Sequence, residues 1–109
     1  MNAKVRARIL RNLPREKAFY FFTSIGNYTG ESAASLKEFT EKISEVNMKS
    51  IVFHFCRGDF EKWISEVLED GELAQQIGVF RKSSPVEEEL KSELHRILSR
   101  RYSSLASNF

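Results

Sequence analysis

The chain has 109 residues, 41% of them hydrophobic, which is enough for one domain with a real hydrophobic core. Its formal net charge of +2 gives no sign of a polyanionic partner, and the single cysteine, Cys56, excludes a scaffold held by internal disulfides. No apolar run approaches the roughly 20 residues that a membrane-spanning helix needs, and the arginine-rich start lacks a signal-peptide core. We therefore expect one domain over residues 1–109, located in the cytoplasm and not in a membrane.

Basic side chains gather near the N-terminus, in an arm over residues 1–17. The segment from Lys4 to Leu13 fits a short amphipathic helix, although its alternation as far as Arg8 also fits a strand. A basic cluster of this kind is able to contact the phosphates of nucleic acid, but the small net charge favours a solvated face paired with acids of the fold. The candidate contacts in the nucleic-acid alternative are Arg6, Arg8, Arg11 and Arg15.

An aromatic run over residues 18–22 and a predicted loop over residues 23–31 come next. The run is too short for its periodicity to decide between a buried extended segment and a helical turn. The loop contains Gly26 and Gly30, which favour turns, and places polar side chains beside Tyr28. It suits a polar ligand such as a sugar or a phosphate; the alternative is a structured turn whose side chains bond their own backbone. The candidate ligand-binding residues are Asn27, Tyr28, Thr29, Ser32 and, farther along the chain, His54.

The middle of the chain begins with a well-marked helix. Ser35 and Glu38 form a capping box, and the apolar stripe that follows predicts a helix ending near Val46. Residues 48–56 include residue types that favour strands. Their apolar positions also share one helical face, and Gly58 stands where a helix C-terminal glycine would, so we interpret the segment as a helix.

Two more helices are expected before residue 80. Asp59 is predicted to cap the clearest helix of the chain, which contains Trp63 and ends at Gly71. A short helix follows and closes at Gly78. The residues expected to form the core are Phe39, Ile43, Ile51, Phe55, Phe60, Trp63, Ile64, Leu68 and Ile77.

A long C-terminal helix is predicted over residues 85–107. Ser84 and Pro85 supply its start signals, and its apolar stripe runs from Val86 to Leu105. A core of short helices is not expected to cover all of that stripe, so we predict a homo-oligomer, specifically a symmetric homodimer, or a partner protein along this helix. Together the elements indicate an all-α fold, a compact bundle of four to five short helices with a longer C-terminal helix.

No catalytic residue, metal site or cofactor is predicted. His54 and Cys56 are the only pair that hints at a metal, and a structural zinc site needs four ligands. Positions two apart do not face each other on a helix, and burial among phenylalanines would make the Cys56 thiol inert. The expected capping role of Asp59 accounts for its carboxylate. We therefore expect the protein not to be an enzyme.

Motifs in the middle of the chain resemble a known family. Besides the segment Gly26–Ala33, they are Ser35-Leu36-x-x-Phe39, Ser50-Ile51-x-Phe53-His54-Phe55, Gly58-Asp59-Phe60-x-x-Trp63-Ile64 and Leu73-Ala74-x-x-Ile77. Over roughly residues 17–78 the chain is similar to an uncharacterised archaeal and bacterial family of small helical domains, a domain of unknown function sometimes attached to carbohydrate-active proteins such as glycosyltransferases. The resemblance leaves the basic arm and the last helix outside.

The resemblance implies a helical fold and no established activity. Combined with the residue patterns, it favours a non-enzymatic binding or protein-interaction module linked to carbohydrate metabolism. Nucleic-acid binding through the basic arm is the alternative.

Overall fold

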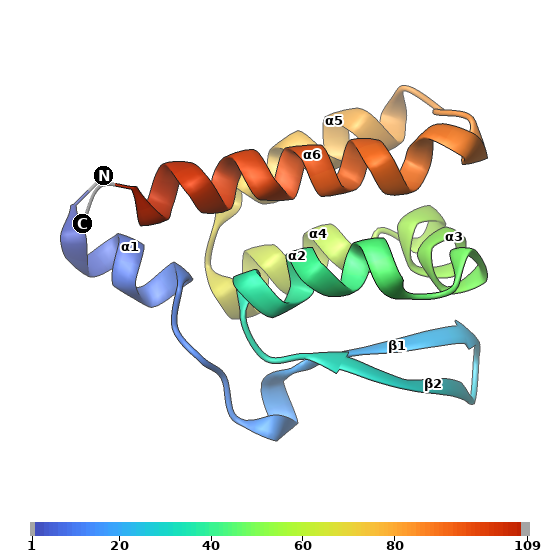
Figure 1. The fold of residues 1–109 in the computed structure, drawn as a ribbon, viewed down its shortest axis with the longest axis horizontal. Helices are drawn as coiled ribbons and strands as arrows, with labels where there is room; N and C mark the ends of the chain where they lie inside the picture. The colour runs from blue at the N-terminus through green and yellow to red at the C-terminus, as the bar shows by residue number, and fades with distance from the viewer. Residues whose placement is uncertain (1, 108–109) are drawn as a thin grey trace.

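The computed structural model describes residues 2–107 and contains both helices and strands (Figure 1). Within this range, the α-helices are α1 (Ala3–Ile9), α2 (Leu36–Glu45), α3 (Met48–Arg57), α4 (Asp59–Trp63), α5 (Gly71–Lys82) and α6 (Glu87–Ala106). A 3-10 turn, η1 (Arg15–Lys17), lies between α1 and the first strand, and a π-helical turn, η2 (Ile64–Leu68), lies between α4 and α5. Strands β1 (Phe19–Ser24) and β2 (Asn27–Ala33) form an antiparallel sheet. The all-α prediction is therefore wrong, and the fold is α+β.

The hairpin replaces both the undecided aromatic run and the predicted loop. Its strands are joined by the two-residue turn Ile25-Gly26, where Gly26 has a φ of 79° that glycine adopts without strain. Phe19 and Phe21 of β1 are buried and Tyr20 between them is exposed, as the alternation of a strand requires. No such alternation marks β2, so its pairing with β1 makes it a strand.

The helices and the hairpin form layers with α2 in the middle. Figure 1 shows the hairpin on one side of α2 and α6 on the other, and α2 contacts both β2 and α6. Helix α3 lies against β1. All nine predicted core residues are buried in the cluster between these layers, so the core prediction is confirmed. Phe19 and Phe21 of the hairpin join them.

The start of α2 is capped as predicted, but the start of α4 is not. Ser35 Oγ accepts a hydrogen bond from the Glu38 amide at 3.1 Å, and the Ala34 amide donates to Glu38 Oε1 at 2.7 Å. Helix α3 ends at Gly58, whose φ of 75° is left-handed. Asp59 then lies in the first turn of α4 and makes no capping hydrogen bond, because its carboxylate is directed to another partner.

Two glycines predicted to end helices do not end them. The segment after α4 closes in the π-helical turn, and Glu69 takes the left-handed conformation with a φ of 65°. Gly71 begins α5, which Asp70 caps by accepting a hydrogen bond from the Leu73 amide at 3.2 Å. Helix α5 then continues through Gly78 to Lys82, because packing on α4 outweighs the weak helix preference of glycine.

Helix α6 buries most of its apolar stripe on its own domain, although Val86 is 56% exposed. The helix begins at Glu87, two residues later than predicted. Ser84, three residues before this start, has a left-handed φ of 53°. Leu90, Leu94, Leu98 and Leu105 are buried, and the helix contacts α2, α3 and α5. The homodimer was predicted because this stripe was expected to be uncovered, and that argument no longer supports it. The homodimer stays a prediction, which the molecular mass in solution would test. No helix within residues 2–107 is long and apolar enough to cross a membrane.

Candidate functional site

A pocket of about 330 Å³ lies between the start of the hairpin and helix α4. We call it the hairpin pocket. Its lining is mostly apolar with a few polar groups, an arrangement typical of sites that bind small molecules. The lining residues are Ala18, Phe19, Tyr20, Phe22, His54, Asp59, Lys62, Trp63, Glu66 and Val67.

His54 joins the hairpin to the helices through both of its ring nitrogens. Its Nδ1 lies 2.8 Å from Oδ2 of Asp59, and the Phe22 amide donates to its Nε2 at 2.8 Å. An amide can only donate, so Nε2 is the unprotonated acceptor and Nδ1 carries the proton shared with Asp59. The strand register shifts on both sides of Phe22, which directs its amide to the histidine and away from β2.

The environment of His54 keeps its ring neutral. Burial lowers the pKa of His54 below its ordinary value and outweighs the hydrogen bond and the charge of Asp59, which raise it. The side chain is only 6% exposed and lies against aromatic rings, among them Phe19 with ring centroids 4.8 Å apart. A histidine beside a carboxylate resembles a catalytic pair. Here, however, the ring nitrogen that would act as the base already accepts a hydrogen bond from the Phe22 amide.

Two aromatic side chains of the pocket are held in place by hydrogen bonds to the backbone. The indole Nε1 of Trp63 donates to the Lys17 carbonyl at 2.8 Å, and the ring is 8% exposed. The Tyr20 hydroxyl donates to the Arg15 carbonyl at 2.5 Å, while 37% of the residue remains exposed. Fixed rings of this kind offer a preformed apolar surface with little conformational entropy to lose.

The charged rim of the pocket comes from helix α4 and the turn after it. Lys62 and Glu66 are exposed residues of opposite charge that line the pocket. Asp59 is half-buried, and its Oδ2 also lies 3.3 Å from Arg57 Nε. The pocket therefore combines aromatic rings with hydrogen-bonding groups of both signs.

The structure places the predicted ligand-binding residues in different environments. Among them, His54 lines the pocket. Tyr28 is 48% exposed and packs on Tyr20, with ring centroids 5.7 Å apart, so it extends the aromatic surface outward from the pocket. Asn27 is exposed at the start of β2, and Ser32 is half-buried opposite Tyr20 in the strand register.

Thr29 has a structural role that matches the alternative weighed for the loop. Its Oγ1 donates to the Phe21 carbonyl at 2.7 Å and accepts from the Glu31 amide at 3.1 Å. Both bonds stabilise the hairpin. The hydroxyl proton of Thr29 is thus already used within the hairpin.

Sequence reasoning missed most of the pocket. Tyr20 was part of an undecided run, and Trp63 and Lys62 were assigned to a helix with a core face. The available signal was the spacing of His54 and Asp59, which are five residues apart with Gly58 between them. A left-handed glycine reverses the direction of the chain and so is able to bring two such side chains together.

Cys56 is exposed, so the prediction that it is buried among phenylalanines is wrong. Its position on α3 points away from the core face that holds Phe55 and His54. Within residues 2–107, no three histidine, cysteine or acidic side chains form a group able to hold a metal ion.

The basic arm is partly paired with the fold. Arg8 Nη1 and Arg11 Nη2 lie 3.6 and 3.8 Å from the carboxylate of Glu69, and Arg11 Nη2 also donates to the Val67 carbonyl at 2.8 Å. Arg6 is half-buried on α1, and Arg15 is exposed in η1. Two of the four candidate nucleic-acid contacts, Arg8 and Arg11, therefore already have a carboxylate partner in the fold.

Comparison with known proteins gives one family. A family model described as "Family of unknown function (DUF5752)" matches residues 16–108. The match extends through α6, which the resemblance had left outside, and excludes nearly all of the basic arm. Neither curated proteins nor solved structures give a significant match.

Proposed function

The chain belongs to the DUF5752 family of unknown function, and we propose that it is a non-enzymatic module that binds a saccharide in the hairpin pocket. The observation that carries the proposal is the pairing of fixed aromatic rings with a charged rim in one pocket. A pyranose ring has an apolar face of C–H groups that packs on aromatic rings, and hydroxyl groups around its edge that need donors and acceptors.

The residues of the pocket match both halves of such a ligand. Tyr20 and Trp63 supply ring surface, and Tyr28 continues that surface along the hairpin. Lys62 and Glu66 supply a donor and an acceptor at the rim. A cavity of about 330 Å³ is at the small end of ligand pockets and suits one or two sugar units.

Binding without catalysis is supported by the hydrogen bonds of His54. Hydrolysis of a glycosidic bond needs two carboxyl groups flanking that bond, one acting as an acid. In the pocket, the carboxylate of Asp59 accepts from His54 Nδ1 and lies beside Arg57. Glu66 is exposed at the rim, so no second carboxyl group is buried in the pocket beside Asp59.

Nucleic-acid binding through the basic arm has weaker support. Glu69 lies between Arg8 and Arg11 and offsets their charge. The family match begins at residue 16, so nearly all of the arm is outside the matched residues.

The experiment is a titration followed by the fluorescence of Trp63, which is the sole tryptophan of the chain. Neutral oligosaccharides of α-glucan, β-glucan, chitin and mannan are added in turn. We expect at least one to shift the emission with a Kd near the millimolar range, and Tyr20→Ala to weaken it about tenfold, as loss of one aromatic contact predicts.

Val79→Ala is the matched control, because Val79 is an exposed apolar residue on α5 outside the pocket. It should leave the affinity unchanged. The proposal is wrong when none of the four sugars shifts the emission, or when Tyr20→Ala and Val79→Ala affect it equally.

A further inference from the structure

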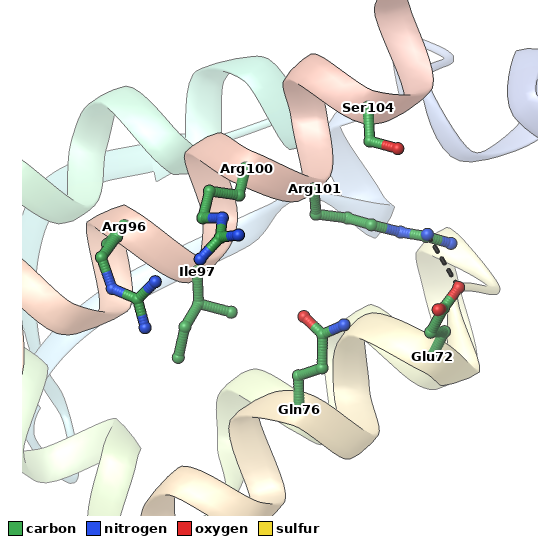
Figure 2. A pocket seen from close by; sticks show the side chains of 7 residues that line it. All are labelled: Glu72, Gln76, Arg96, Ile97, Arg100, Arg101 and Ser104. Atoms are coloured by element: carbon green, nitrogen blue, oxygen red, sulfur yellow. Dashed lines mark ion pairs between the residues drawn. The ribbon is translucent and has the colours of Figure 1, made fainter.

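A second and larger concave site lies between helices α5 and α6 (Figure 2). Helix α2 separates α6 from the hairpin in the order of the layers (Figure 1). The volume of the site is about 520 Å³, and it shares no lining residue with the hairpin pocket. Three of its lining residues are arginines, Arg96, Arg100 and Arg101, all from α6. We call it the arginine groove.

Arg101 forms the fixed end of the groove. Its side chain is 10% exposed, and its Nε and Nη2 donate to the two oxygens of Asp70 at 2.9 and 3.0 Å. Its Nη1 lies 2.8 Å from Oε2 of Glu72, whose side chain is 60% exposed. Asp70 therefore holds the guanidinium in place, while Glu72 is a replaceable partner at the surface.

Arg96 and Arg100 are one helical turn apart and supply charge that is available to a ligand. Figure 2 shows both guanidinium groups directed from α6 into the space above α5. Arg96 pairs with Glu93 on the same helix, in an exposed i,i+3 pair of the kind that is easily exchanged. Arg100 is exposed and forms no ion pair within 4 Å with any carboxylate of residues 2–107.

The remaining walls fit the organic part of a ligand. Gln76 of α5 faces the arginines across the groove, and its amide offers both a donor and an acceptor. Ile97 lies between Arg96 and Arg100 and gives the floor an apolar surface. A phosphate on the two arginines would place its attached group over Ile97 and within reach of Gln76.

We propose that the arginine groove binds the phosphate group of a small phosphomonoester. Two guanidinium forks one turn apart match a tetrahedral group with three free oxygens better than a planar carboxylate with two. The volume fits a small organic molecule, and the net charge of only +2 gives little general attraction for a polyanion. This site is independent of the proposed saccharide pocket.

The test is calorimetric titration of the whole chain with glycerol 3-phosphate, inorganic phosphate, acetate and glycerol, at fixed ionic strength. We expect glycerol 3-phosphate to bind, inorganic phosphate to bind more weakly, and acetate and glycerol not to bind. Arg100→Gln should weaken binding about tenfold or more, since it removes charge-assisted hydrogen bonds to the phosphate.

Lys37→Gln is the control, because it removes the same charge from an exposed position on α2 outside the groove. It should change the affinity by less than about twofold, the effect of net charge alone. Absence of phosphate binding, equal loss in Arg100→Gln and Lys37→Gln, or acetate binding as tightly as glycerol 3-phosphate would each overturn the proposal. Circular dichroism of each variant checks that it is folded; a folded Arg96→Gln variant serves as a second test if Arg100→Gln is not.

Discussion

Asp70 and Arg101 form a buried, bidentate ion pair, in which the side chain of Asp70 is 1% exposed and that of Arg101 is 10% exposed. The same carboxylate caps α5 through the Leu73 amide. One side chain thus starts α5 and ties it to α6, 31 positions later in the chain. This contact fixes the relation of the two helices that form the arginine groove.

Replacing Asp70 should therefore be severe. Asp70→Ala leaves the Arg101 charge buried without its main partner, and breaking a buried pair in this way costs about 3–5 kcal/mol. Asp70→Asn keeps the capping oxygen and loses only the charge, so it should lower the free energy of unfolding by less than Asp70→Ala does. Urea unfolding measures both.

Glu93→Gln provides the comparison, because the Glu93–Arg96 pair is exposed. It should leave the free energy of unfolding essentially unchanged. Equal effects of Asp70→Ala and Glu93→Gln would show that burial of the Asp70–Arg101 pair has no energetic consequence.

His54 should make the protein less stable in mild acid. Its pKa is lower in the folded chain than its ordinary value near 6.5, so below that pH the unfolded chain takes up a proton that the folded chain does not. The stability from this residue is complete above about pH 6.5 and is lost as the pH falls toward the lowered pKa. The slope for one proton is at most about 1.4 kcal/mol per pH unit.

The measurement is the free energy of unfolding between about pH 7.5 and pH 5, in wild type and in His54→Gln. The slope below pH 6.5 should be smaller in His54→Gln. Val79→Ala, which removes no titratable group, is the control and should keep the wild-type slope. An unchanged slope in His54→Gln would contradict the lowered pKa of His54 in the folded chain.

Local signals predicted the helical part of the fold well. The capping box at Ser35 and Glu38 and the left-handed Gly58 act within one helical turn, so the sequence carries them in full. The core residues followed from helical periodicity for the same reason. The end of α5 was misplaced because Gly78 is kept helical by its packing on α4, where Glu61 is the nearest side chain.

The hairpin was not predictable in the same way. β2 has no apolar alternation, and its place depends on pairing with β1 and on hydroxyl bonds such as that of Thr29 to the Phe21 carbonyl. The hairpin pocket needs β1 beside α4, a contact between distant segments that no local pattern encodes. The link between His54 and the Phe22 amide spans 32 positions.

Trp63 should be essential for stability as well as for the proposed binding. The ring packs on Phe39 with centroids 5.0 Å apart and is 8% exposed, which confirms the prediction that it is a core residue. Trp63→Ala should cost about 3–5 kcal/mol. Trp63→Phe keeps an aromatic ring and loses the bond to the Lys17 carbonyl, so it should cost less. A melting temperature unchanged in Trp63→Ala would refute this role.

Gly58 should be required for the contact between His54 and Asp59, because it forms the turn between α3 and α4. Its φ of 75° costs other residues about 1–2 kcal/mol. A Cβ at this position would lie 3.6 Å from the guanidinium of Arg81, an ordinary contact, so conformational strain is the only expected penalty. Gly58→Ala should therefore lower the free energy of unfolding by that amount, and Gly58→Asn by less, since asparagine tolerates this conformation better.

Gly71→Ala is the control, because Gly71 begins α5 with open space around it and no left-handed φ, and it should be neutral or stabilising. Thermal unfolding of the three variants decides the matter: a loss in Gly71→Ala as large as in Gly58→Ala would mean that the turn conformation at Gly58 is not the cause.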